Sequence, residues 1–280
     1  MAPVSESPKE LLARYHLKPK HSWGQNFLGD PGVLARIAST ARVGPGDAVL
    51  ELGAGLGHLT RALAATGAAV TAVERDRELV GVLEASPLEG VRIVAANAAD
   101  LQFANAAGKA PLVLVGNLPY HLTSPILFGV LDQHADVTRA VFTVQKEVGE
   151  RLAAPPGSRD YGLLSVLLGL HFDVEVAFAL SKGLFHPPPK VESVVVVLEH
   201  RNSPRAAVRS EARFRRLVKA GFGQRRKTLL NALRGHAELG GEAAIVSALE
   251  VASVDGRRRA ETLSVEEFAA LERALGPWSK

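Results

Sequence analysis

The sequence lacks several residue types and patterns that would point to particular chemistry. Its 280 residues contain no cysteine, which excludes disulfides, thiolate metal sites, iron–sulfur clusters and a cysteine nucleophile. No apolar run approaches the ~18 residues that cross a membrane. The amino terminus also lacks the basic and apolar regions of a secretory signal peptide. We therefore expect a cytoplasmic protein with no membrane partner and no bound metal.

The charge of the chain is distributed unevenly. Residues 1–200 carry a net charge of −3, whereas residues 201–280 carry +7, out of a total of +4. A basic carboxy-terminal part favours a polyanionic partner. The same charge would also arise from a solvated helix surface that only aids solubility. With 47% hydrophobic residues, the chain can form one large or two smaller domains with a substantial core.

Strand-like and helix-like segments alternate along the first 200 residues, which predicts an α/β fold with a parallel sheet covered by helices on both faces. Two later strands flank the Pro187–Pro189 turn, and we expect them to be antiparallel neighbours at one edge of the sheet. The predicted strands are 48–52, 69–73, 91–95, 112–116, 139–145, 173–179 and 193–199. The predicted helices between them include 58–65, 77–84 and 125–133.

The pattern becomes entirely helical after residues 201–204. A final helix is expected at 265–275, where Ser264 is a candidate N-cap and Glu267 follows three residues later. We therefore predict two domains. Residues 1–200 form the larger one and begin with a basic extension, and residues 201–280 form a small helical domain.

The segment Asn117-Leu118-Pro119-Tyr120 follows the predicted strand 112–116, and its proline stops the strand ladder. The Asn117 amide oxygen and the Leu118 carbonyl can accept both N–H bonds of an exocyclic amine, while Tyr120 stacks on its ring. Two such acceptors favour a pyramidal adenine N6 with its lone pair directed at a methyl donor, which needs no strong base. An ordinary turn after a strand would use the same residue types.

A glycine turn at residues 53–57 connects the predicted strand 48–52 to a helix. Gly53 and Gly55 allow the backbone to approach a ligand closely, and the helix amino terminus favours a negative group. Glu74 ends the second strand and can accept the hydroxyls of a ribose. The position of Gly57 and the preceding Glu51 favour S-adenosylmethionine over NAD, although a dehydrogenase remains the alternative.

The third predicted strand ends just before Asn97, whose amide can bond the edge of an adenine ring. Ala98 follows it and would lie beside the same ring. Asp100 is an alternative ligand for the adenine, or it only caps the next helix.

Five motifs occur in an order that resembles the ribosomal RNA adenine N6,N6-dimethyltransferase family, and within it the bacterial small-subunit branch. They are residues 24–28 (GQNFL), 51–57 (ELGAGLG), 117–120 (NLPY), 145–147 (QKE) and 185–191 (FHPPPKV). The basic run 222–229 (FGQRRKTL) also resembles this branch, and the likeness covers about residues 15–235. The resemblance implies a Rossmann-like class I methyltransferase sheet with a small helical carboxy-terminal domain.

The resemblance also implies roles for matching residues. Phe185 would cover the second face of the target adenine; without the resemblance, packing of its loop onto the core is the favoured interpretation. Catalytic positions are Asn117, Leu118, Pro119, Tyr120 and Phe185. Cofactor positions are Gln25, Asn26, Leu28, Glu51, Gly53, Gly55, Glu74, Arg75, Asn97, Ala98 and Asn117. RNA-contacting positions are Lys20, Lys190, Arg225, Arg226 and Lys227.

The sequence departs from the family at two positions. The family usually has Asp where Asn97 stands, and we expect the asparagine to weaken adenine binding. The family often has Asn where His121 stands, and we favour His121 as a surface turn residue over a role in placing the substrate. The implied reaction dimethylates two adjacent adenosines near the 3′ end of small-subunit ribosomal RNA in an immature 30S subunit, by a monomer. The alternatives are a large-subunit enzyme of the macrolide-resistance type and a non-catalytic nucleic-acid-binding factor.

Overall fold

The computed structural model describes residues 6–224 and 226–276, and the chain divides into two compact units. The sheet unit comprises residues 1–149 and 175–200, and the helical unit comprises residues 150–174 and 201–280. Residues 150–174 thus belong with the helical unit, although their predicted place was in the first domain. This segment includes the helix α8 (Leu163–His171), which contacts two helices that follow residue 201.

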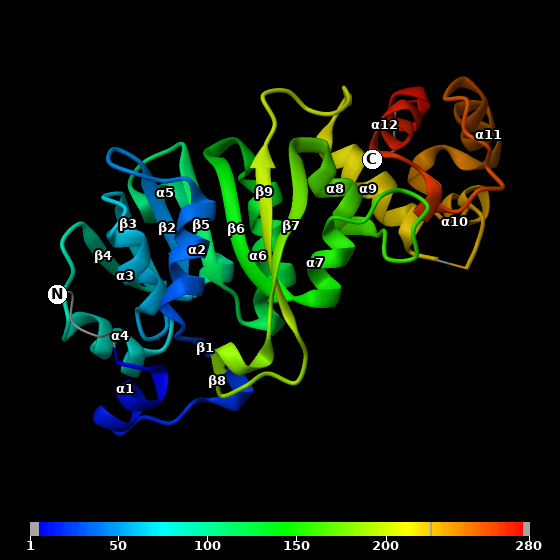
Figure 1. The fold of residues 1–280 in the computed structure, drawn as a ribbon. Helices are drawn as coiled ribbons and strands as arrows, with labels where there is room; N and C mark the ends of the chain where they lie inside the picture. The colour runs from blue at the N-terminus through cyan, green and yellow to red at the C-terminus, as the bar shows by residue number, and fades with distance from the viewer. Residues whose placement is uncertain (1–5, 225, 277–280) are drawn as a thin grey trace. The chain divides into compact units, whose positions relative to one another are not determined.

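The sheet has seven strands, and each of the seven predicted strands is present. All neighbouring pairs from β4 to β6 are parallel, and β9 pairs with β6 in the antiparallel sense. The last two strands along the chain are neighbours at one end of the sheet, as predicted. The order is β4 (Val91–Ala95), β3 (Ala69–Glu74), β2 (Ala48–Leu52), β5 (Leu112–Asn117), β6 (Val137–Gln145), β9 (Ser193–His200) and β7 (Phe172–Leu180) (Figure 1).

Helices cover both faces of this sheet. Leu34 in α2 and Leu63 in α3 pack with Val49 and Val113 on one face, and Figure 1 shows α5 and α6 behind the sheet. All five residues of β2 are buried, as expected for a parallel strand covered on both sides. The helices are α1 (Pro8–Arg14), α2 (Pro31–Ala41), α3 (His58–Ala64), α4 (Arg77–Glu84), α5 (Phe103–Ala107), α6 (Thr123–Asp132) and α7 (Lys146–Leu152).

A second, two-stranded sheet joins distant parts of the sheet unit. The strand β1 (Phe27–Leu28) pairs antiparallel with β8 (Phe185–His186), so that Phe27 lies opposite His186 and Leu28 opposite Phe185. This pairing holds the amino-terminal segment against the loop that contains the three prolines.

The helical unit has its own apolar core. Phe214 and Phe268 are buried in it, and the Phe222 ring stacks 6.0 Å from that of Phe268. The predicted cap at Ser264 is confirmed, because its hydroxyl accepts from the Glu267 N–H at 3.2 Å and the Glu267 carboxylate accepts from the Ser264 N–H at 2.8 Å. Its helices are α8 (Leu163–His171), α9 (Glu211–Phe222), α10 (Leu229–Leu233), α11 (Gly241–Val251) and α12 (Val265–Ala274).

One carboxylate lies inside this helical core. Glu272 is fully buried; it accepts a hydrogen bond from the Arg209 N–H at 2.8 Å and lies 3.3 Å from Nε of Arg213. The pair fixes α12 against the start of α9. Among the described residues, no helix is long and apolar enough to cross a membrane.

Candidate active site at the carboxyl ends of the parallel strands

The glycine turn after β2 forms one wall of the candidate site. The Gly53 and Ala54 N–H groups both donate to the Val73 carbonyl at 2.9 Å, which ties the turn to the end of β3. Gly55 has a φ of +58°, and a Cβ atom there would lie 3.2 Å from the Phe27 ring. Only glycine tolerates both that conformation and that close approach.

Two buried acids lie beside this turn. Glu74 accepts hydrogen bonds from the backbone N–H groups of Gly55, Arg75 and Asp76 at 2.8–2.9 Å. Burial raises the pKa of Glu74, while these N–H donors oppose the rise. Burial also raises the pKa of Glu51 to about 7, and the charge of Glu74 adds to the effect.

The Glu51 carboxyl is incompletely bonded. Its side chain is only 1% exposed, and its Oε2 has no hydrogen-bond partner among the residues that the structure describes. Interaction with the Thr60 side chain lowers the pKa of Glu51 but does not offset burial, and a buried carboxylate with so few partners is costly. The arrangement therefore suits a ligand that brings a cation or a hydrogen-bond donor to this oxygen.

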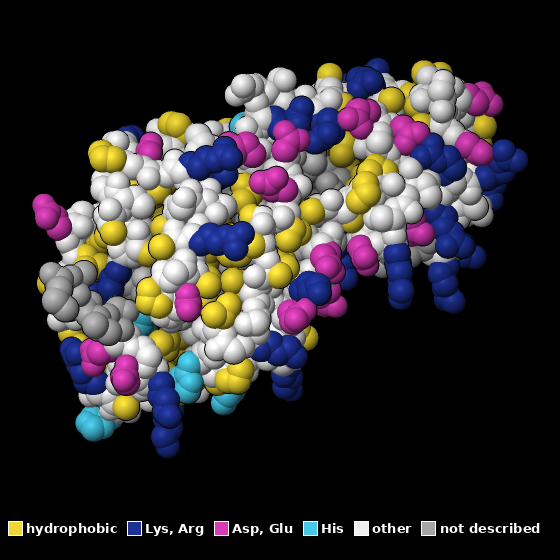
Figure 2. Space-filling model, viewed as in Figure 1, with side chains coloured by type: hydrophobic (Ala, Val, Ile, Leu, Met, Phe, Trp, Pro, Cys, Tyr) yellow, Lys and Arg dark blue, Asp and Glu magenta, His cyan; other side chains and the backbone are white. Residues whose placement is uncertain are grey.

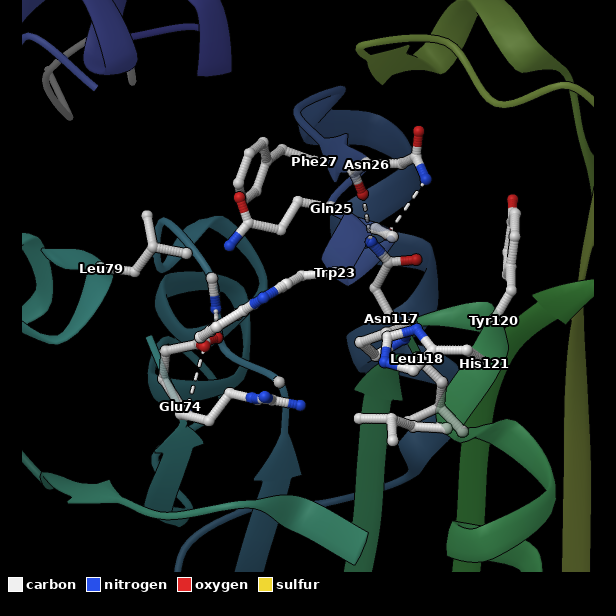
Figure 3. Close-up of a pocket in the computed structure, with 16 residues that line it drawn as sticks. Trp23, Gln25, Asn26, Phe27, Glu74, Leu79, Asn117, Leu118, Tyr120 and His121 are labelled. Carbon is white, nitrogen blue, oxygen red and sulfur yellow. Dashed lines mark hydrogen bonds between the residues drawn. The ribbon is translucent and has the colours of Figure 1, made fainter. Parts of the chain in front are cut away.

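The opposite wall is formed by the end of β5. Nδ2 of Asn117 donates to the Asn26 carbonyl at 2.8 Å, and Figure 3 shows Oδ1 of Asn117 on the side of Tyr120. Because the amide nitrogen is held in this way, the oxygen is left to accept hydrogen bonds in the cavity. The Tyr120 hydroxyl is 2.8 Å from Oγ of Ser193, which is fully buried. Burial raises the pKa of Tyr120, so its ring stays a neutral phenol.

One cavity brings together most of the predicted catalytic and cofactor residues. It is lined by Gln25, Asn26, Gly53, Gly55, Glu74, Arg75, Asn117, Leu118, Pro119 and Tyr120, among others. Leu28 and Glu51 line a neighbouring hollow that shares Gly53, Gly55 and Asn117 with the first. Residues from β2, β3 and β5 meet here because the carboxyl ends of parallel strands lie along one edge of the sheet.

Other predicted residues lie outside these two hollows. Asn97 caps the short helix Ala98–Asp100 and donates to the Asp100 carboxylate at 2.6 Å, so the two candidate adenine ligands are joined. Phe185 is 5% exposed and packs in the core with Leu28 and Leu34. Its packing role is thus visible, and its role in covering the target adenine stays a prediction.

The predicted RNA-contacting residues have different surroundings. The Lys20 ammonium lies 2.7 Å from Asp76 and 2.5 Å from Glu78, which favours a structural role for Lys20 over contact with RNA. Lys190, Arg226 and Lys227 are exposed, and Figure 2 shows several Lys and Arg side chains projecting from this face of the molecule. Arg225 lies outside the described residues.

Several residues of the site had no predicted role. Trp23 lines the cavity, and the Arg75 guanidinium lies 4.1 Å from the centre of its ring. His121 is exposed, as favoured, but also lines the cavity. Asp76 binds two side chains of the amino-terminal segment. From the sequence, Asp76 can be identified only as the N-cap of the helix that follows it.

Comparisons with known proteins agree with this geometry. A sequence model of the family described as ribosomal RNA adenine dimethylase matches residues 16–273. A protein of Myxococcus xanthus named ribosomal RNA small subunit methyltransferase A is 60% identical over 97% of this chain and 96% of its own length. A protein of the same name from Moorella thermoacetica is 43% identical over 95% of each chain.

Solved structures show the same fold. A dimethyladenosine transferase from Plasmodium falciparum superposes with a TM-score of 0.75 at 24% identity, over 88% of this chain and 95% of that one. The 23S rRNA methyltransferase ErmE gives a TM-score of 0.66 at 28% identity, over 89% and 99%. The predicted α/β methyltransferase fold is therefore confirmed, and the chain is a methyltransferase that belongs to the ribosomal RNA adenine dimethylase family.

Proposed function

We propose that this enzyme transfers two methyl groups from S-adenosylmethionine to N6 of each of two adjacent adenosines near the 3′ end of small-subunit ribosomal RNA. The substrate is supported by relatives named small subunit methyltransferase A, at up to 60% identity. An immature 30S subunit is the form of the RNA that we expect it to modify. We further propose that it acts in the cytoplasm as a monomer, because one sheet unit supplies the whole cavity.

The residues around the glycine turn fit S-adenosylmethionine. The unpartnered Oε2 of Glu51 would take the ammonium of its methionine part, and Gly55 places no side chain in the narrow space between the turn and the Phe27 ring. Three backbone donors leave Glu74 about one of its roughly four acceptor sites, which a ribose hydroxyl would use. When bound, this cofactor supplies an electrophilic methyl group attached to a sulfonium sulfur.

The orientation of the Asn117 amide is the observation that carries the proposal. Its Nδ2 is engaged by the Asn26 carbonyl, so Oδ1 can accept one N–H of the adenine amine while the Leu118 carbonyl accepts the other. These bonds reduce delocalisation of the N6 lone pair into the ring and direct it at the methyl group. N6 would gain the methyl group and lose one proton to solvent, while the broken S–CH3 bond would leave its electron pair on a neutral thioether, so positioning and electrostatics would provide the catalysis.

Tyr120 would hold the base during this reaction. Stacking of an unpaired base on an aromatic ring contributes roughly 1–3 kcal/mol, which offsets part of the cost of extracting the adenosine. The bond to Ser193 fixes the plane of the Tyr120 ring before the base arrives. Outside the cavity, the exposed Lys190, Arg226 and Lys227 would contact phosphates and make binding dependent on salt.

The test is methyl transfer from labelled S-adenosylmethionine to small subunits that lack the modification, with large-subunit RNA as a parallel substrate. Dimethyladenosine in the small-subunit RNA alone supports the proposal. Asn117→Ala should abolish transfer and leave cofactor affinity nearly intact. Asn105→Ala, an exposed asparagine in α5, is the matched control and should keep full activity. Normal turnover by Asn117→Ala would remove the role given to this residue.

The same assay separates the alternatives. Label in large-subunit RNA would place the enzyme with 23S rRNA methyltransferases, which the likeness to ErmE makes the nearest competing class. No label in either RNA, with RNA binding retained, would indicate a chain that has kept the fold without the reaction.

A further inference from the structure

The amino-terminal segment that crosses the cavity is fastened at both of its ends. We call residues 20–27 the strap. It contains the short helix His21–Trp23 and turns at Gly24, which has a φ of +64°. The Lys20 N–H donates to Oε1 of Gln25 at 2.8 Å, which closes the strap into a compact loop. Every fastening described below lies within the sheet unit.

Asp76 holds the first end of the strap. Its carboxylate accepts from the Lys20 ammonium at 2.7 Å through Oδ1 and from the Gln25 amide at 2.8 Å through Oδ2. The side chain is only 3% exposed. Burial alone would raise the pKa of Asp76. The hydrogen bonds from Lys20 and Gln25 together outweigh burial and hold the pKa of Asp76 below its usual value. The carboxylate is therefore charged throughout the physiological range.

The second end of the strap reaches the catalytic asparagine. The Asn26 carbonyl is the acceptor that fixes Nδ2 of Asn117, and the adjacent Phe27 pairs with His186. Gln25, which Asp76 binds, is the residue directly before Asn26. A displacement of the strap at Gln25 therefore moves the atom that orients the Asn117 amide.

The strap forms part of the wall of the cavity. Trp23, Gln25 and Phe27 line the same hollow as Gly53 and Gly55 of the glycine turn. A cofactor bound against the glycine turn would therefore lie beside the strap. Asp76, through Lys20 and Gln25, and Glu78, through Lys20 alone, join the strap to the start of α4.

We infer that Asp76 is a positioning residue that closes the strap over the bound cofactor and, through Asn26, aligns the Asn117 amide for the target amine. The inference rests on the proposed function, because it gives the strap a part in that reaction. One carboxylate would then both retain the cofactor and orient the Asn117 amide that holds the target amine.

The first experiment replaces Asp76 by serine. Serine is a good N-cap, so Asp76→Ser keeps an acceptor for the Glu78 N–H at the start of α4 while it loses both strap contacts. We expect at least a tenfold loss of affinity for S-adenosylhomocysteine by calorimetry. We also expect at least a fivefold lower kcat at saturating cofactor, with the melting temperature unchanged within about two degrees. Glu78→Gln is the matched control, because exposed Glu78 contacts Lys20 but has no bond to Gln25, and it should change neither quantity.

A second readout follows the Asn117 amide itself. Its side-chain NH2 resonance can be assigned by its disappearance in Asn117→Asp, and its hydrogen exchange should be slowed by the bond to Asn26. Asp76→Ser should accelerate that exchange, which a merely structural loss elsewhere would not do. In a double-mutant cycle, adding Lys20→Met to Asp76→Ser should weaken cofactor binding little further, because Lys20 contacts Asp76 without lining the cavity.

Unchanged affinity, kcat and amide exchange in Asp76→Ser would overturn the inference while leaving the proposed function intact. If Asp76→Ser lowers the melting temperature, Asp76→Asn provides the decision, because asparagine also caps helices but presents an NH2 group to a strap donor. Wild-type affinity in that variant would equally overturn the inference. If the unaltered enzyme fails to methylate small-subunit RNA, the proposed function fails, and calorimetry and exchange still test the strap.

Discussion

Glu51 should make cofactor affinity depend on pH, because its buried carboxyl has a pKa of about 7 and must be ionised to pair with an ammonium. The ionised fraction falls about 25-fold between pH 7.5 and pH 5.5 for such a group, and affinity should fall by about the same factor if only the carboxylate binds. Calorimetric titration with S-adenosylhomocysteine at pH 5.5, 6.5 and 7.5 measures this slope. The Glu51→Gln variant should bind S-adenosylhomocysteine more weakly at pH 7.5, and its affinity should depend less on pH.

The same substitution should have the opposite effect on the stability of the chain without cofactor. The folded-state pKa of Glu51 is raised from 4.5 to about 7. The free energy that folding loses by burying the ionised carboxylate is therefore absent below pH 4.5 and complete above pH 7. A shift of this size corresponds to about 3 kcal/mol in the free energy of unfolding. At pH 8, Glu51→Gln should therefore stabilise the chain without cofactor by at most that amount. Urea unfolding at pH 4.5 and pH 8 measures it. An unchanged pH slope for cofactor affinity in Glu51→Gln, together with unchanged stability at pH 8, would refute the reasoning.

Three further substitutions test the site and the helical core. Glu74→Ala should abolish measurable cofactor binding, since it removes the predicted ribose acceptor; unchanged affinity by calorimetry would exclude it from the site. Tyr120→Phe should lower kcat/KM for methyl transfer about two- to tenfold, because it removes one hydrogen bond to Ser193 that contributes ~0.5–1.5 kcal/mol. Tyr120→Ala should lower kcat/KM much more. Glu272→Leu should destabilise the protein by about 3 kcal/mol in urea unfolding, because it leaves Arg213 without its buried carboxylate; wild-type stability would show that the pair is dispensable.

The parts of the fold that depend on neighbours in sequence could be predicted. The strands at 48–52 and 91–95 and the Ser264 capping box were found at their expected positions, because hydrophobic runs and caps are local signals. The convergence of Glu74 and Asn117 followed from the parallel order of their strands. These features needed only the pattern of residues and the geometry of parallel sheets.

Contacts between distant residues could not be predicted in this way. Lys20 and Asp76 are 56 positions apart, and Asn26 and Asn117 are 91 apart. Nothing in the spacing of these residues indicates that they meet. Likewise, residues 150–174 continue the alternating pattern, yet they join the helical unit.

The pairing of Phe27 with His186 has a consequence for the order of events during synthesis. Translation proceeds at ~5–20 residues per second, so about 10–30 s separate the production of the two strand partners. Late in that interval the emerging polypeptide has its glycine turn and Asn117, but its amino-terminal segment is not yet anchored at residue 27. The pairing of β1 with β8 can therefore form only after the chain has been made as far as the loop of three prolines.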